Sequence, residues 1–436
     1  MTSIPTEVRC IDPKRMPRQR YWVMWMLFVS VVINYLDRSN LSIVAPRISE
    51  DLHLDPAALG LTFSAFGWTY ALLQLPASRL VDRIRPRMLF AIALALWSTA
   101  TFLMGFAQTF VSLFAFRLAV GAFEAPTYPI NNRVVTQWFP ERERAGAIGV
   151  YTSGQFVGLA FLTPVLALIA SRYGWRPIFE ITGGLGVLWA MAWWWLYRDP
   201  AEKHSASENE LLPIKRNKPQ SLPLNLTVSR SSALWKDLGI VLGSRKLWGV
   251  YIGQFCLASI QWFFLTWFPT YLVRYRHIAL TEAGLYSSLP YLAGFIGVIS
   301  GGFLSDWLLR HGRSITVARK IPIVTGCFLA SAIVLASQFH GPHLVIAFMT
   351  CSSFGCGFAS ITWSIVSTMA PEHLIGLTGG AFNCISNLSA IVVPIVVGLL
   401  IRGNSFTRPL AYIATMAMMG MCSFVFLVGK IERVMV

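Results

Sequence analysis

RLAVGAFEAPTYPINNR, residues 117–133, places two opposite charges at the end of a long apolar run. The 29 residues from Met88 to Phe116 contain no Asp, Glu, Lys or Arg, and about 20 such residues suffice to cross a bilayer as a helix. Glu124 follows Arg117 by two helical turns, so both side chains lie on one face, about 10 Å apart along the axis. A charge at the bilayer centre costs at least about 2.5–3.5 kcal/mol, and such residues commonly line a functional cavity. The alternative is an ion pair that only joins helices.

Composition extends this pattern to the whole chain. Of 436 residues, 55% are hydrophobic and 13% charged, and the mean hydropathy is +0.56, which is typical of a polytopic membrane protein. Residues 321–371 are long enough for two spans, and three further spans, around 22–44, 110–130 and 178–197, tolerate charge. The other uncharged stretches that are long enough to span are Pro56–Ser78, Met88–Phe116, Ala145–Ser171, Leu247–Val273, Ala283–Ser305, Leu374–Ile401 and Pro409–Gly429. The sequence therefore predicts an all-α membrane protein with twelve transmembrane helices.

The net charge of +16 does not indicate nucleic-acid binding, because the basic residues gather in alternate loops. This asymmetry is the positive-inside pattern, and it predicts that both termini are cytoplasmic. The lipid bilayer, in a bacterial inner membrane, is the expected surrounding. The basic clusters are Lys14, Arg15, Arg18 and Arg20; Arg79, Arg83, Arg85 and Arg87; Arg133, Arg142 and Arg144; Lys215, Arg216 and Lys218; Arg310, Arg313, Arg319 and Lys320; and Lys430 and Arg433.

An internal repeat divides the chain into two halves. At an offset of 224 residues, one set of positions matches another: Gly60, Leu61, Ser64, Leu80 and Asp82 correspond to Gly284, Leu285, Ser288, Leu304 and Asp306. Duplicated halves in a transporter place the substrate site between them, near the bilayer midplane. The predicted organisation is a cytoplasmic tail (1–20), a six-helix half (21–197), a polar cytoplasmic linker (198–246), a second six-helix half (247–430) and a short tail (431–436).

The first span carries a second charged pair, Asp37 and Arg38. Asn34 and Asp37 lie near one helical face, whereas Arg38 is turned by about 100° from Asp37, so the two charges can serve different neighbours. The pair could instead sit at the membrane surface. Eight uncharged residues, Ser39–Pro46, separate it from the next charge, which favours a submerged or cavity-facing position.

Several motifs together resemble the major facilitator superfamily and, within it, the sugar-acid branch of the anion:cation symporters. The resemblance is carried by INYLDR (33–38), FSAFGWTY (63–70), RLAVGAFEAPTYP (117–129), RVVTQWFPERERA (133–145), GVYTSGQFVGLAF (149–161), WFFLTWFPTYL (262–272) and GLTGGAFNCISNLS (376–389). The family's loop signature follows the eighth span as Gly302, Asp306 and Arg310. Its first-half copy keeps Asp82 and Arg83, but Ser78 replaces the usual glycine.

The resemblance implies a secondary active transporter that imports a D-galactonate-like anion by proton symport, with two pseudo-symmetric halves that alternate access. It implies that Asp37 and Glu124 carry protons and that Arg117 is linked to a carboxylate. The expected substrate contacts are Arg38, Tyr70, Gln155, Trp363, Asn383 and Asn387, and the expected gating residues are Asp82, Arg83, Gly302, Asp306 and Arg310.

The second half has no charged residue inside its spans apart from their edges. It offers hydroxyl and amide groups, which suit a polyhydroxylated substrate because they donate and accept hydrogen bonds at little charge cost. Packing between helices is the alternative role for each of them. The set comprises Gln254, Gln261, Tyr291, Ser360, Trp363, Ser364, Ser367, Asn383, Ser386 and Asn387.

No enzymatic constellation competes with transport. The chain has no phosphate-binding loop for a nucleotide, and its seven cysteines show no metal or disulfide spacing. We therefore expect no enzyme activity, no catalytic residue, no cofactor and no metal, and partners limited to a small carboxylate substrate, protons and lipid, in a monomer.

Four other substrate classes stay open within the same family, namely a hexuronate, a hexarate (galactarate or glucarate), tartrate and an aromatic acid such as phthalate. A different class is a membrane sensor that binds sugar acids without moving them. Loss of the Glu124 carboxylate would spare ligand binding in such a sensor.

Overall fold

The computed structural model describes residues 19–199, 230–339, 341–371, 374–403 and 405–433. Within these ranges the side chains of 75, 78, 82, 145 and 230–236 are not described. Most of the predicted N-terminal tail, half of the predicted C-terminal tail and most of the predicted linker therefore lie outside the described residues.

The described chain forms twelve successive helical rods in two sets of six. The first set is α1 (Gln19–Asp51); α2 (Pro56–Arg83); α3 (Pro86–Met104); α4 (Phe110–Glu124) with α5 (Thr127–Trp138); α6 (Glu141–Val157) with η2 (Gly158–Leu162) and α7 (Thr163–Tyr173); and α8 (Arg176–Leu196). The second set is α11 (Arg245–Thr266) with α12 (Phe268–Thr270) and η4 (Tyr271–Tyr275); α13 (Leu280–Arg310); α14 (Ile315–Ser331) with η5 (Ala332–Ser337); α15 (Pro342–Phe358) with α16 (Thr362–Met369); α17 (Ile375–Leu400); and α18 (Thr407–Cys422) with η7 (Ser423–Leu427).

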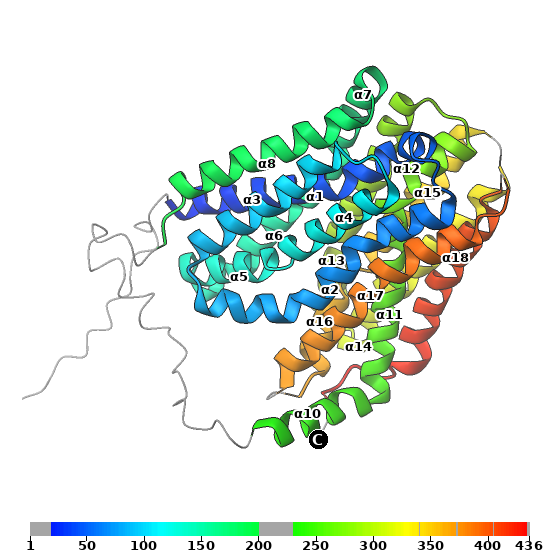
Figure 1. Ribbon diagram of the computed structural model, residues 1–436. Helices are drawn as coiled ribbons and strands as arrows, with labels where there is room; N and C mark the ends of the chain where they lie inside the picture. Colours follow the sequence, from blue (N-terminus) through cyan, green and yellow to red (C-terminus); the bar gives the residue numbers. More distant parts are fainter. Residues whose placement is uncertain (1–18, 200–229, 340, 372–373, 404, 434–436) are drawn as a thin grey trace, which may run out of the picture.

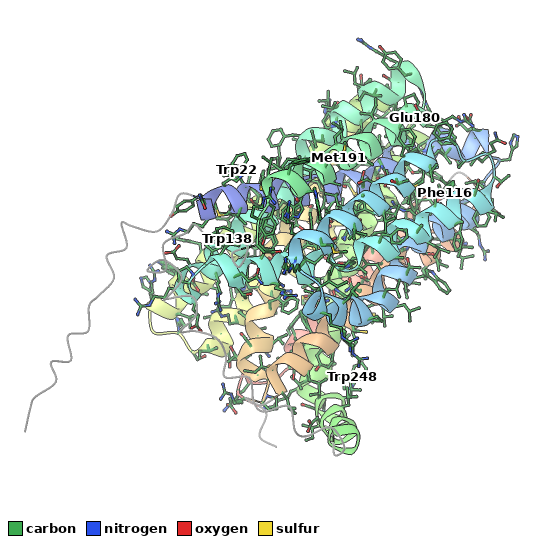
Figure 2. The ribbon with its side chains drawn as sticks, turned by 60° about the vertical axis from the view of Figure 1, so that its left-hand side comes forward. Trp22, Phe116, Trp138, Glu180, Met191 and Trp248 are labelled. Carbon is green, nitrogen blue, oxygen red and sulfur yellow. The ribbon has the colours of Figure 1, made fainter. Side chains whose placement is uncertain are left out.

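Nine of the described rods are both long enough and apolar enough to cross a membrane. The other three of the twelve rods are α1, α2 and α8. Large apolar side chains project outward from the bundle (Figure 2). Trp22 and Met191, on α1 and α8, are about half exposed, at 54% and 49%. An apolar surface of this extent suits a helix bundle in contact with lipid. Apolar side chains are stable against hydrocarbon tails, and each helix forms the hydrogen bonds of its own backbone groups. The predicted twelve-helix fold is confirmed.

Proline breaks the fourth rod next to a predicted site residue. The helix α4 ends at Glu124, and α5 begins at Thr127. Pro126 and Pro129 have no N–H group, so the carbonyls four residues before them lose their usual donors. The break therefore follows Glu124 directly, and the two prolines of the APTYP motif (125–129) explain it.

The two bundles converge at one end and diverge at the other. In Figure 1 the rods meet near α7 and α12 and separate toward α5 and α16, and the main contacts between halves run along α2 with α17 and along α7 with α13. A Cβ atom added at Gly60 would lie 2.4 Å from the Pro394 carbonyl oxygen, and one at Gly398 would lie 2.4 Å from that of Pro56. Phe63 meets Trp267 edge to face, with ring centroids 5.4 Å apart. The converging end is therefore closely packed.

We expect Gly398→Ala to weaken this contact, because the added methyl group overlaps a main-chain oxygen of the opposite half. Overpacking of this kind costs about 1–3 kcal/mol, so the apparent melting temperature of the purified protein should fall. The control is Gly380→Ala on the same helix, where an added Cβ has no neighbour within 4 Å among the described residues. An equal fall for both variants would contradict the expectation.

The end of the linker is helical. The helix α10 (Arg230–Gly243) precedes α11, contacts α11 and α17, and buries Val241 completely. The division of the chain at 21–197, 198–246 and 247–430 remains a prediction.

Candidate functional site

A cavity of about 190 Å³ lies between the two halves. The first half lines it with Tyr35, Arg38, Gln155, Phe156 and Leu159. The second half lines it with Ala258, Gln261, Trp262, Phe264, Leu265, Tyr291, Gly294, Ser353, Cys356, Gly357, Ser386 and Asn387. The cavity thus has one charged side chain among the described residues, a few amides and hydroxyls, and aromatic walls, which is the usual pattern of a small-molecule site.

Arg38 connects the cavity with a buried carboxylate. Its Nε donates to Glu124 Oε1 at 2.5 Å, and its Nη2 pairs with the same oxygen. The guanidinium carbon lies 4.8 Å from the centroid of the Phe66 ring and 5.0 Å from those of Tyr35 and Tyr70. Ring faces attract a cation, and more strongly where water is excluded. Arg38 is therefore held in one orientation, with an acid on one side and the cavity on the other.

Tyr70 and Asp37 lie beside the cavity and do not line it. Tyr70 is 5% exposed and stacks on Phe66 with ring centroids 5.1 Å apart, so in this structure it supports Arg38. Asp37 is fully buried and accepts a hydrogen bond from Trp97 Nε1 at 3.1 Å. As predicted, Asp37 and Arg38 serve different neighbours.

Arg117 is buried and forms its hydrogen bonds with the main chain of α1. Its Nη1 donates to the main-chain oxygen of Asp37 at 3.2 Å, and its Nη2 donates to that of Arg38 at 3.3 Å. The hydrogen bonds of Arg117 thus go to α1 carbonyls, whereas its interaction with the buried acids Asp37 and Glu124 is electrostatic. Glu124 has its hydrogen-bonded ion pair with Arg38, and the link of Arg117 to a carboxylate stays a prediction.

The turn of α1 that Arg117 binds also carries two side-chain hydrogen bonds of Asn40. The Leu41 N–H group, whose helical partner would be the Asp37 carbonyl, donates to Asn40 Oδ1 at 2.6 Å. Asn40 also donates through Nδ2 to Thr182 Oγ1 on α8, at 3.2 Å. Arg117 of α4 and Thr182 of α8 thus both hold this turn of α1 through polar contacts.

The predicted polar residues of the second half differ in whether they line the central cavity. Asn387 lines the cavity, and its Nδ2 donates across the interface to Gln74 Oε1 at 3.1 Å. Gln254 accepts from Thr362 Oγ1 at 2.6 Å and thereby ties α11 to α16. Trp363 is 52% exposed and packs edge to face on Phe382, with ring centroids 4.7 Å apart. Asn383, like Trp363, is not among the residues that line the cavity.

The sequence prediction missed Tyr35. It lies three residues before Arg38, on the same helical face, and its hydroxyl is 3.4 Å from that of Tyr128 on α5. The i, i+3 spacing was the available signal. Of the expected contacts, Arg38, Gln155 and Asn387 line the cavity together.

The predicted gating residues lie at the diverging ends of α2 and α13. Asp306 pairs with Arg319 of α14 at 3.5 Å, within the second half. Gly302 has no neighbour for an added Cβ within 4 Å among the described residues, and Arg83 and Arg310 are exposed. The Asp82 side chain lies outside the described part of the chain. Their role in gating stays a prediction.

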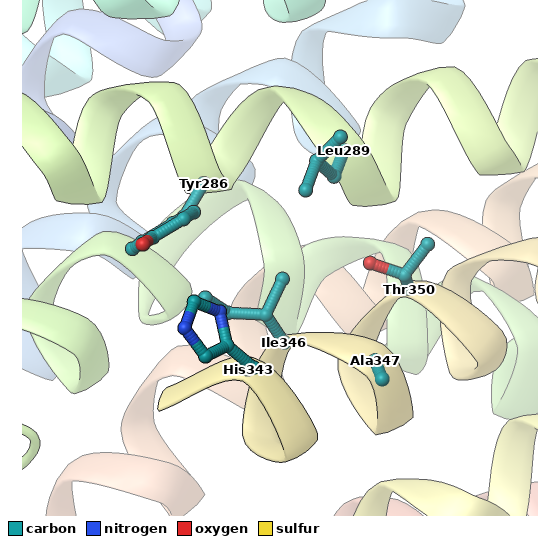
Figure 3. Close-up of a pocket in the computed structure, with 6 residues that line it drawn as sticks. All are labelled: Tyr286, Leu289, His343, Ile346, Ala347 and Thr350. Atoms are coloured by element: carbon teal, nitrogen blue, oxygen red, sulfur yellow. The ribbon is translucent and has the colours of Figure 1, made fainter. Parts of the chain in front are cut away.

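A wider groove of about 430 Å³ opens between α13 and α15 (Figure 3). It is lined by Tyr286, Leu289, His343, Ile346, Ala347 and Thr350. All six belong to the second half, and Leu289 and Ala347 are exposed. Because the groove lies away from the interface between halves and its described lining has no cation matched to an acid, it is a poorer candidate for an anionic substrate than the central cavity.

Among the described residues, no group of three or more His, Cys, Asp or Glu side chains could hold a metal ion.

Comparisons with known proteins agree with this architecture. The sequence model of the Major Facilitator Superfamily matches residues 27–394. The chain is 44% identical to the D-galactonate transporter of Escherichia coli O6:H1 (strain CFT073), over 96% of this chain and 97% of that one. It is 35% identical to the "Probable galactarate/D-glucarate transporter GudP" of Escherichia coli K12, over 95% and 94%.

Solved structures share the fold at low sequence identity. A bacterial homologue of the human lysosomal transporter Spinster, in an inward-facing and unoccupied conformation, superposes with a TM-score of 0.72 at 18% identity, covering 94% of this chain and 95% of that one. A variant of the nucleoside transporter NupG gives 0.69 at 14% identity, covering 93% and 99%. On these matches and on its two six-helix halves, the chain belongs to the major facilitator superfamily, a family of transporters and not of enzymes.

Proposed function

We propose that this protein imports a sugar-acid monoanion, with D-galactonate as the first candidate, together with protons and by alternating access. The proposal depends mainly on the position of Arg38. This residue lines the central cavity, and its guanidinium group is bound to the buried acid Glu124. An arginine is suited to bind a carboxylate through two parallel N–H groups. The 44% identity to a D-galactonate transporter supports the same substrate class.

The buried charges supply a coupling mechanism. Asp37 and Glu124 balance Arg38 and Arg117, so the four-residue cluster is neutral when both acids are ionised. A substrate carboxylate adds one negative charge and competes with Glu124 for Arg38. Protonation of Glu124 releases Arg38 to the substrate and restores the charge balance, so substrate and proton bind more favourably together than apart. Reciprocal coupling of this kind is what symport requires.

The number of cations favours a monoacid over a diacid. Arg38 is the single positively charged side chain among the described residues that line the cavity. A hexarate or tartrate has two carboxylates, and the second would meet amides and hydroxyls only. D-galactonate and a hexuronate each have one carboxylate, and their hydroxyls fit Gln155, Gln261 and Asn387. The aromatic walls, Phe156 and Trp262, keep an aromatic acid as an alternative.

The arrangement of the halves fits alternating access. The halves are closely packed at the end where α1 finishes and diverge at the end where α1 begins. With both termini in the cytoplasm, as the loop charges predict, the diverging end faces the cytoplasm of a bacterium. Rocking about the central cavity would close one end as the other opens.

The test is uptake of labelled D-galactonate into proteoliposomes with an imposed inward proton gradient. We expect accumulation that collapses when the gradient is dissipated. We also expect competition by unlabelled galactonate to exceed competition by galactarate, a hexuronate, tartrate and phthalate. Uptake of another acid would retain the mechanism and change the substrate. Binding of galactonate without any uptake would contradict transport and favour a sensor.

A further inference from the structure

Three buried polar residues, Asn34, Thr127 and Asn131, lie near Glu124 in the fold and do not line the central cavity. Asn34 lies on α1, one turn before Arg38. Ala125 and Pro126 keep right-handed helical φ and ψ angles at the break between α4 and α5, so Thr127 and Asn131, three and seven residues after Glu124, lie near its face. All three are 0% exposed. They are also absent from the residues that line the central cavity, so the substrate does not explain them.

Their polar atoms have no hydrogen-bond partner among the described residues. This holds for Glu124 Oε2, for both amide atoms of Asn34 and of Asn131, and for the Thr127 hydroxyl. The Asn34 side chain lies within hydrogen-bonding reach of the Glu124 carboxylate, although neither of its amide atoms has the geometry of a hydrogen bond. A buried polar group without a partner is destabilising, so a cluster of such groups indicates a bound ligand.

The chemistry of the cluster identifies the ligand as water. Oxygen acceptors occur beside amide donors, namely the Nδ2 groups of Asn34 and Asn131. A metal cation would satisfy the acceptors and leave the donors unpaired, and Arg38 and Arg117 already place two positive charges nearby. Water donates and accepts, and buried water commonly makes about three hydrogen bonds to groups of this kind.

The surroundings confine such water. The next turn of α5 presents Val134 and Val135, which are 0% and 1% exposed, and Ile130 beside them is 0% exposed. Pro126 and Pro129 add acceptors, because the carbonyls of Ala122 and Ala125 have no helical N–H donor. The region around Glu124 is therefore polar, and buried apolar side chains follow one turn away along α5.

We propose that Asn34, Thr127 and Asn131 hold ordered water against the second carboxylate oxygen of Glu124 and that this hydrated pocket sets the proton affinity of the acid. Arg38 binds Oε1 on one side, and the water binds Oε2. The three residues are positioning residues that act on the substrate through Glu124. The proposal rests on the proposed proton coupling at Glu124.

The charged and titratable groups facing Glu124 come from three helices. They are Arg38 and Asp37 on α1, Tyr70 on α2, and Arg117 on α4, the helix of Glu124 itself. None of them is changed by a substitution at Thr127. A change in the pH dependence of transport after such a substitution therefore reports on the hydrated pocket.

The test compares Thr127→Val, which keeps the shape and removes the hydroxyl, with Thr127→Ser, which keeps the hydroxyl. We expect Thr127→Val to move the pH midpoint of gradient-driven galactonate uptake upward by about half a unit, a roughly threefold change in proton affinity, since the ionised carboxylate loses water that donates to it. Thr127→Ser should restore the wild-type midpoint. Galactonate binding at a pH far below the midpoint should be unchanged in both.

The matched control is Thr270→Val in the second half. The Thr270 hydroxyl is also buried without a hydrogen-bond partner among the described residues, and it therefore has no bond to an acid there. Its pH midpoint should equal that of the wild type. The inference is wrong if Thr127→Val leaves the midpoint unchanged while Glu124→Gln abolishes coupling. The proposed function itself is wrong if Glu124→Gln leaves coupling intact.

A structure of the wild-type protein tests the same inference if the variants do not fold. A structure of the purified transporter at a resolution that shows ordered solvent should contain water within hydrogen-bonding distance of Glu124 Oε2 and Asn131. A dry pocket, with these side chains paired to protein groups, would overturn the inference.

Discussion

Glu124→Gln should abolish gradient-driven accumulation and preserve substrate exchange. Glutamine has the shape of a protonated glutamic acid and cannot release a proton, so Arg38 is permanently freed from its ion pair. The loaded state then forms at any pH, and the substrate moves without proton coupling. We expect the accumulation ratio under an imposed pH gradient to fall at least about tenfold, which corresponds to about 1.4 kcal/mol of lost coupling. Counterflow of labelled against unlabelled galactonate should continue.

Glu180→Gln is the matched control for this prediction. Glu180 lies in the first turns of α8, beside Gly105 on the neighbouring rod, and is not among the cavity-lining residues. Its replacement should leave the accumulation ratio within a factor of about two. Intact accumulation in Glu124→Gln would remove Glu124 from the coupling mechanism.

Arg38→Lys should weaken galactonate binding by about ten- to a hundredfold. Lysine keeps the charge but has a single ammonium group, so it cannot bind a substrate carboxylate through two parallel N–H groups. It also loses the planar contacts with the rings of Tyr35, Phe66 and Tyr70. Equilibrium binding of labelled galactonate to the purified protein measures the loss. Removal of the charge is a poorer test, because an unpaired Glu124 in the core would cost about 3–5 kcal/mol of stability.

Arg276→Lys separates loss of binding from loss of structure. Arg276 is also held by an aromatic residue, since its Nε donates to the Tyr271 hydroxyl at 2.7 Å, and its Nη1 donates to the Phe339 carbonyl at 2.8 Å. It does not line the cavity. Arg276→Lys should lower the melting temperature and leave the affinity for galactonate unchanged. Equal losses of affinity in both variants would show that Arg38 acts only through stability.

The central cavity is the smaller of the two cavities described above, yet its chemistry makes it the better candidate for a substrate site. It joins residues from both halves, and Arg38, the one cation among its described lining residues, is already balanced by a buried acid. The groove between α13 and α15 has more room but no such balance. For an anionic substrate whose transport is tied to protons, matched charges matter more than volume.

Much of the architecture follows from the sequence itself. Apolar runs of about 20 residues can satisfy their backbone groups in a bilayer only as helices, so composition and spacing predicted twelve of them, and the repeat at an offset of 224 residues predicted two halves. The charges at Asp37, Arg38, Arg117 and Glu124 stood out for the same reason, because a buried charge is costly wherever the chain folds.

The pairing of these charges was decided only by the tertiary structure. Helical spacing relates residues within one rod, so it could place Arg117 and Glu124 on one face. It could not show that α1 packs Arg38 against Glu124 or that Arg117 donates its hydrogen bonds to main-chain carbonyls of α1. It also could not separate Asn387, which lines the cavity, from Asn383 on the same helix, which does not. Local sequence determines periodicity, whereas contacts between residues 86 positions apart depend on how whole helices pack.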